Sequence, residues 1–167
     1  MKTLLKITSY LFVVLLVSTS ACKKQKLPSG DHSFYCYIDG ELFVPKGEVN
    51  LNPKPYDSDG LTFLQYDEFF RAQAKNYPTT IMFNIVNWGR GTHHLSESTD
   101  YYDFNTNHAM ARVNGIWYKS KSNSGSVTFT ESRLDGDDNT MGTFEFTLYN
   151  ENDDSDVIHV TGGHFDD

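Results

Sequence analysis

Cysteine, basic residues and long apolar runs are all scarce in this chain. Only Cys22 and Cys36 occur among its 167 residues, and 14 lysines and arginines stand against 22 aspartates and glutamates, which gives a formal net charge of −8 at pH 7. Nucleic-acid backbones are bound through clustered Lys and Arg, so this balance argues against a nucleic-acid partner. It suits instead a soluble domain whose copies repel one another.

The one long apolar run lies at the start of the chain. Ile7–Val17 carries no charge, follows the basic residues Lys2 and Lys6, and precedes the small residues Ser18–Ala21. The run is too short to span a membrane as a helix, which takes about 20 residues. Its composition is typical of a secretory signal peptide, and we expect Met1–Ala21 to be removed.

Cys22 follows Ser20 and Ala21 directly. This arrangement resembles the lipobox of bacterial lipoproteins, in which the cysteine is acylated and becomes the mature N-terminus. Thr19 departs from that pattern, which usually has Leu there, and ordinary cleavage after Ala21 is the alternative. We favour lipidation of Cys22, because cysteine is otherwise scarce. The resemblance implies a membrane-anchored lipoprotein of the cell envelope, on its periplasmic face or at the cell surface.

Two further segments follow the signal peptide. Residues 22–32 are polar and lysine-rich, and we expect a tether that holds a domain away from a membrane. Residues 33–167 have the length of a single domain with one core. With Cys22 acylated, Cys36 has no disulfide partner. Cys36 alternates in phase with apolar neighbours and lacks a basic one, so it is expected to be a small buried hydrophobe.

Apolar residues recur with a period of two along most of the domain, and no sustained helical period occurs. The clearest alternation is at Val127/Phe129, Phe144/Phe146/Leu148 and Ile158/Val160, separated by acidic connections at Leu134–Asn139 and Asn150–Asp156. Asp39-Gly40 and Asn114-Gly115 are favoured two-residue hairpin turns. The sequence therefore predicts an all-β domain, an antiparallel β-sandwich or flattened β-barrel built from hairpins and a C-terminal meander.

Two stretches in the middle of the chain need a choice. Asp67–Lys75 could open a short helix, but we favour a strand that puts Phe70, Ala72 and Ala74 on one face. The run Thr80–Asn87 is apolar on both faces, which predicts a strand that is central or covered.

Five strand-and-turn motifs are spread over the domain: Phe34–Pro45, Gly89–Leu95, Ser124–Thr130, Gly142–Thr147 and Val160–Asp166. Together they resemble those of a group of small bacterial cell-envelope lipoproteins that carry an uncharacterised all-β domain, a domain of unknown function. The resemblance implies a lipid-anchored all-β domain and transfers no catalytic residue. The polar loop Ser96–Asn107 has no counterpart in that group, so a specific role could lie there.

Candidate metal ligands are weakly patterned. His93, His94 and His108 flank the polar loop, but adjacent residues on a strand point to opposite faces, so solvated loop residues are expected and a zinc site is the alternative. The acidic stretches Asp135–Asn139 and Glu151–Asp156 offer oxygen ligands for Ca²⁺ without matching the EF-hand template. We expect solvated turns and no cofactor, with a weak structural calcium site as the alternative.

Catalytic motifs are missing as well. The chain has no G-x-S-x-G motif, no Cys–His pair with local sequence support and no glycine-rich phosphate loop. We therefore expect that the protein is not an enzyme. Aromatic residues gather around the polar loop: Trp88, Tyr101, Tyr102, Phe104 and Trp117. Exposed rings beside Asn and Asp are typical of sugar-binding surfaces, whereas ordinary core and cross-strand pairs are the alternative.

The functional expectation is therefore a non-catalytic envelope lipoprotein, a binding or assembly module whose ligand is a protein or a glycan. A carrier of a small apolar ligand inside a barrel is the first alternative. A hydrolase with paired carboxylates is the second.

Overall fold

The computed structural model describes residues 27–30, 32–47, 60–98 and 100–167. The expected signal peptide Met1–Ala21, the lipidation site Cys22, part of the tether and the whole loop Val49–Asp59 lie outside the described residues. Within the described part, no helix has the length and apolar character that crossing a membrane requires.

Within the described residues, eleven strands form one antiparallel sheet. In chain order they are β1 (Ser33–Ile38), β2 (Glu41–Phe43), β3 (Leu61–Gln65), β4 (Phe69–Asn76), β5 (Thr79–Val86), β6 (Gly91–His94), β7 (His108–Val113), β8 (Ile116–Lys119), β9 (Gly125–Glu131), β10 (Met141–Asn150) and β11 (Asp153–Asp166). A single 3-10 turn, η1 (Arg133–Asp135), lies between β9 and β10 in the described chain.

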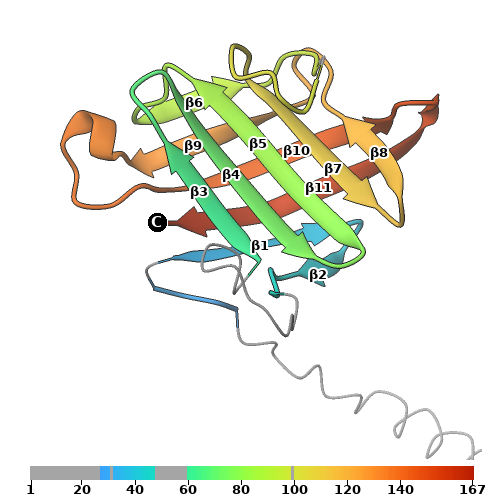
Figure 1. Cartoon of the computed structure of the whole chain (residues 1–167), viewed down its shortest axis with the longest axis horizontal. Helices are drawn as coiled ribbons and strands as arrows, with labels where there is room; N and C mark the ends of the chain where they lie inside the picture. Colours follow the sequence, from blue (N-terminus) through green and yellow to red (C-terminus); the bar gives the residue numbers. More distant parts are fainter. Residues whose placement is uncertain (1–26, 31, 48–59, 99) are drawn as a thin grey trace, which may run out of the picture.

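The sheet bends into two layers (Figure 1). Its strand order is β2-β1-β11-β10-β8-β7-β5-β4-β3, with β9 pairing to β10 and β6 pairing to β9. We call β3, β4, β5, β7 and β8 the front layer, and β1, β2, β6, β9, β10 and β11 the back layer. The predicted all-β antiparallel class is confirmed, and the sheet is not closed into a barrel, so the architecture is sandwich-like.

The long strand β10 joins the layers. Its first part, Met141–Phe146, pairs with β9 in the back layer, while Tyr149 and Asn150 pair with β8 in the front layer. Along its whole length β10 also pairs with β11. The predicted C-terminal meander is thus the element from which both layers extend.

The core lies between the layers and is filled by phenylalanine rings. The centroid of the Phe165 ring lies 5.4 Å from those of Phe70 and Phe83 and 5.3 Å from that of Phe129. Distances of this size are those of aromatic rings in contact. The interior between these strands is therefore occupied by side chains.

The hairpin predictions are confirmed by backbone geometry. Asp39 and Gly40 have φ of 49° and 86°, and Asn114 and Gly115 have φ of 51° and 90°. Two successive positive φ values define the turn type that matches the twist of an antiparallel pair, and Asn, Asp and Gly adopt them at low energy.

Other expectations are confirmed or corrected by the strand bounds. The ambiguous stretch at Asp67–Lys75 is strand β4, and Cys36 is fully buried, which raises the pKa of its thiol to about 12. The acidic connection predicted at Asn150–Asp156 is wrong in extent. The turn comprises only Glu151 and Asn152, and Asp153–Asp156 already belong to β11, because the side chains of Asn150 and Asp156 hydrogen-bond across the hairpin at 2.8 Å.

Candidate functional site

The loop between β6 and β7 lies on the outer face of the front layer and is fastened to its strands. The side-chain amide of Asn84 on β5 donates to the carbonyl oxygen of Thr106 at 2.9 Å. The Arg71 guanidinium on β4 donates through Nη2 to the carbonyl oxygen of Asp103 at 3.1 Å. The backbone N–H of Val86 donates to the Asn107 side chain at 2.8 Å. The loop therefore has a fixed position over β4 and β5.

Beneath this loop lies a row of polar side chains. Arg71, Asn84 and His108 are register partners on β4, β5 and β7, and all three are buried although they point away from the core. Burial lowers the pKa of His108 and also that of the Arg71 guanidinium. Arg71 Nε, Asn84 Oδ1 and His108 Nε2 have no hydrogen-bond partner among the described residues. The loop converts an outer strand face into a covered polar floor.

Four of the predicted aromatic residues are brought together above this floor, and we call them the aromatic patch: Tyr101, Tyr102, Phe104 and Trp117. The Tyr101 ring centroid lies 5.0 Å from that of Tyr102 and 6.0 Å from that of Trp117. The Tyr101 hydroxyl donates to Gln73 Oε1 at 2.5 Å, which anchors its ring to β4. Tyr102 is 73% exposed. The patch therefore offers ring surface to solvent on a fixed support.

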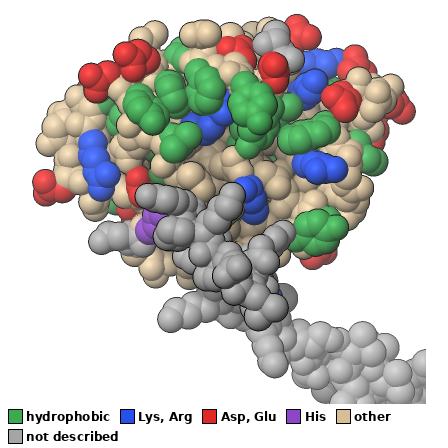
Figure 2. Space-filling model, viewed as in Figure 1, with side chains coloured by type: hydrophobic (Ala, Val, Ile, Leu, Met, Phe, Trp, Pro, Cys, Tyr) green, Lys and Arg blue, Asp and Glu red, His purple; other side chains and the backbone are tan. Residues whose placement is uncertain are grey.

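The same face is visible as a whole in Figure 2. Hydrophobic side chains gather over the front layer, with Lys and Arg among them, and Asp and Glu lie mostly towards the edge. This arrangement places cations beside the exposed rings.

Trp88, the fifth predicted residue, is not part of this surface. It is 3% exposed, its indole N–H donates to the carbonyl oxygen of Tyr66 at 2.7 Å, and its ring lies 5.5 Å from that of Phe70. The strand alternation along β5 would turn Trp88 outward. Asn87, with φ of 48°, breaks the alternation and directs the indole into the core.

Two arginines of the site were missed by the sequence argument. The Arg71 Cζ lies 4.0 Å from the Phe104 ring centroid, and the Arg112 Cζ lies 5.8 Å from that of Trp117. Arg112 and Trp117 are direct cross-strand partners across the Asn114-Gly115 turn. A two-residue turn fixes that register, so the sequence did contain a signal for this pair.

The three histidines considered as zinc ligands, His93, His94 and His108, lie in different environments. His93 Nε2 lies 3.0 Å from the carbonyl oxygen of Gly89, His94 is exposed, and His108 is buried beneath the loop. Among the residues that the structure describes, no group of three or more His, Cys, Asp or Glu side chains could hold a metal ion.

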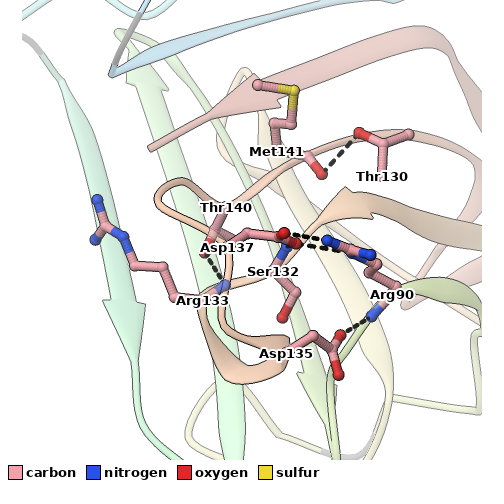
Figure 3. A network of polar contacts seen from close by, with 8 residues as sticks. All are labelled: Arg90, Thr130, Ser132, Arg133, Asp135, Asp137, Thr140 and Met141. Atoms are coloured by element: carbon pink, nitrogen blue, oxygen red, sulfur yellow. Dashed lines mark hydrogen bonds and ion pairs between the residues drawn. The ribbon is translucent and has the colours of Figure 1, made fainter.

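The acidic turn before β10 is occupied by an arginine instead (Figure 3). The Arg90 guanidinium donates to both carboxylate oxygens of Asp137, and the Arg90 backbone N–H donates to Asp135 Oδ2 at 2.5 Å. The backbone N–H of Ser132 donates to Asp137 Oδ2 at 2.8 Å. The hydrogen bond from Arg90, followed by that from Ser132, lowers the pKa of Asp137. Asp135 and Asp137 therefore hold the turn before β10 against Arg90, in the connection between β5 and β6.

A cleft lies away from the aromatic patch, between β3 and the connection that contains η1. This cleft has a volume of about 630 Å³ and is lined in part by Gln65, Tyr66 and Arg133. Both ends of the Gln65 amide are already used, since Nε2 donates to Asp167 and Oε1 accepts from Thr140 at 2.9 Å. Phe63 and Trp88 also line this cleft, but Trp88 is largely buried and hydrogen-bonded to Tyr66.

Comparisons with known proteins add no relative. No protein-family model matches this chain, and comparisons with curated proteins and with solved structures gave no significant match.

Proposed function

We propose that this chain is a non-catalytic binding module, held at the cell envelope by a lipid on Cys22, whose aromatic patch takes a carbohydrate. The observation that carries the proposal is the grouping of Tyr101, Tyr102 and Trp117 on one supported face, with the Tyr102 ring largely exposed.

The chemistry of the patch suits a sugar. Aromatic rings stack on the apolar faces of sugar rings, while polar groups nearby take the hydroxyls. The exposed residues Asp100 and Asn105 lie in the same loop, and Asp100 Oδ1 accepts the backbone N–H of Tyr102 at 3.2 Å. Because the loop is fastened to β4 and β5, little conformational entropy would be lost when a ligand binds.

The first alternative, a carrier of an apolar ligand, needs an internal cavity. Phenylalanine rings in mutual contact occupy the space between the layers, and the sheet ends are open rather than closed into a barrel. These features favour a ligand at the surface.

The second alternative, a hydrolase with paired carboxylates, needs a proton donor whose pKa is raised. The pKa values of Asp137 and Asp153 are shifted in the opposite direction, chiefly by hydrogen bonds from the side chains of Arg90 and Ser155. Asp137 holds the turn before β10 and Asp153 accepts hydrogen bonds from Ser155 within β11, so neither carboxylate fits the part of a proton donor.

A glycan array probed with the detergent-solubilised protein tests the proposed ligand class. We expect binding to at least one glycan, and loss of that binding in the Tyr102→Ala/Trp117→Ala double variant. The matched control is Tyr35→Ala, which removes a tyrosine ring from β1 in the back layer, where it lies 5.3 Å from the ring of His164. Binding that survives the double variant, or no binding to any glycan, would sink the carbohydrate proposal.

The lipid anchor has its own test. We expect Cys22→Ala to move the protein from the membrane fraction to the soluble fraction, because the acylated residue is lost and no other hydrophobic anchor is proposed. A mutant that stays with membranes as wild type does would refute the anchor.

A further inference from the structure

Charge is divided between the two layers. The front-layer strands carry Arg71, Lys75, Arg112 and Lys119 and no aspartate or glutamate. The back-layer strands carry no lysine or arginine. Their acidic residues are Glu41, Glu131, Glu145, Asp153, Asp154, Asp156 and Asp166. In a chain with a net charge of −8, the strands under the aromatic patch are therefore basic, while the loop that covers them adds Asp100 and Asp103.

Arg112, the exposed arginine of the front layer, has no carboxylate partner among the described residues, whereas the buried Arg71 interacts electrostatically with Asp103. This separates Arg112 from Lys119, whose Nζ lies 3.2 Å from Glu151 Oε2, and from Arg90, which binds Asp137 with both arms of its guanidinium. An arginine without a counter-charge, beside exposed rings, keeps its charge for an incoming group.

Arg112 is placed to use that charge. It is exposed, and its guanidinium lies over the Trp117 ring. A guanidinium held against an aromatic ring keeps its N–H donors at its edge, where they match the two oxygens of a carboxylate or sulfate. Arg71 is 4% exposed beneath Phe104 and Tyr101 and interacts with Asp103, so it does not reach a ligand.

We infer that the ligand of the aromatic patch is an acidic polysaccharide, a sugar chain that carries carboxylate or sulfate groups. Trp117 and Tyr102 stack on sugar rings, and Arg112 pairs with an anionic substituent of the same chain. This inference rests on the proposed function and adds the charge of the ligand to it.

The same charges fit other polyanions less well. Nucleic acid presents a phosphate at every step and is held by several Lys or Arg at once, whereas this surface has one exposed arginine without a counter-charge beside its rings. An acidic peptide offers carboxylates but no apolar sugar face on which the rings of Tyr102 and Trp117 could stack. The observations therefore favour a charged sugar chain.

The experiment compares polymers that differ in charge alone. Binding of the detergent-solubilised full chain is measured by calorimetry for polygalacturonate against its methyl ester, and for dextran sulfate against dextran. We expect at least one acidic polymer to bind, with affinity about tenfold or more above that of its neutral counterpart, since a hydrogen-bonded ion pair supplies that much.

Variants locate the effect. Arg112→Gln is expected to lower affinity for the acidic polymer about tenfold and Arg112→Lys to recover only part of it, because Lys keeps the charge but loses the planar fork. Arg133→Gln, an exposed arginine outside the front layer, is the control and is expected to bind as wild type does.

The outcomes separate the two claims. Equal binding of charged and neutral polymers, or an Arg112→Gln variant that binds normally, would overturn the acidic ligand. The carbohydrate proposal would still stand if the Tyr102→Ala/Trp117→Ala variant lost binding. Polyglutamate or single-stranded DNA that bound as tightly as the acidic polysaccharides would show recognition of charge alone, and would overturn the inference as well.

Discussion

The front and back layers differ in the side chains that they contribute to the inside and the outside of the sandwich. Facing the core, the front layer contributes Ala72, Ala74, Ala109 and Ala111 beside the rings of Phe70 and Phe83, whereas the back strands contribute Phe129, Phe144, Phe146 and Phe165. Facing outward, the front layer carries cations and the aromatic patch, and the back layer carries most of its acids. The alanines of the front layer thus leave room for large rings of the back layer, which is how cores reach high packing density.

The two layers tolerate substitutions at different places. The back layer is tightly fitted: a Cβ on Gly142 would lie 2.1 Å from the carbonyl oxygen of Thr128, and one on Gly163 would lie 2.4 Å from the Phe144 ring. The outer face of the front layer is instead covered by a long loop. These back-layer positions therefore tolerate little change, while the outer front face is left to carry a binding surface.

The largest effect is expected from Phe165→Ala in the back layer. Its ring contacts rings from both layers, so truncation should lower the free energy of unfolding by about 3–5 kcal/mol, from lost burial and the cavity left behind. Urea denaturation measures this. Phe104→Ala, which removes a half-buried ring from the aromatic patch, is the front-layer counterpart, and its loss should be clearly smaller. Equal losses would contradict the view that the outer front face contributes little to packing.

An intermediate effect is expected from the polar floor of the front layer. Burial lowers the pKa of His108 in the folded state, so the unfolded chain binds a proton more readily. The free energy of unfolding should therefore fall as pH decreases below the ordinary histidine pKa of about 6.5. His108→Gln should weaken this pH dependence, measured by urea denaturation at pH 7.5 and 5.5.

The control for that experiment is His159→Gln on β11, an exposed histidine that lies 3.1 Å from the Thr147 hydroxyl. It should leave the pH dependence nearly unchanged. The interpretation of a proton-sensitive floor under the loop fails if the two variants respond alike.

The smallest effect on stability is expected from the arginines. Arg90 lowers the pKa of Asp137, so its contribution is present above the carboxyl's unfolded pKa and is lost as pH falls through the folded pKa. Arg90→Gln should therefore reduce stability slightly at pH 7 and less at pH 3. Arg112→Gln should leave thermal unfolding unchanged at both pH values, since it has no ion pair among the described residues. A destabilised Arg112→Gln would assign this arginine a structural role.

Much of the fold followed from local patterns. Alternation predicted β4, β5 and the C-terminal meander, and Asp39-Gly40 and Asn114-Gly115 predicted two hairpins, because strand period and turn chemistry are local properties of the chain. The bend that separates the layers was not predictable in this way. It depends on β10 changing partners from β9 to β8, which is a long-range choice.

The site was predictable only in part. Tyr101, Tyr102, Phe104 and Trp117 were found by composition around one loop. Trp88 was wrongly grouped with them. Asn87, with a positive φ, turns the Trp88 side chain into the core, and such a change of direction leaves no periodic signal in the sequence. Arg71 was missed, since nothing in the sequence shows that residues 95–107 lie across β4. The separation of charge between strands could have been predicted once the strands were bounded.

The shared strand β10 also determines how the molecule comes apart. A sandwich of two independent sheets can lose one sheet while keeping the other, but here the same backbone hydrogen-bonds into both layers. Neither layer can open fully without breaking β10 and its long ladder with β11. We therefore expect unfolding to be a single cooperative event, and the amide hydrogens of β10 to be the last among the described strands to exchange with solvent.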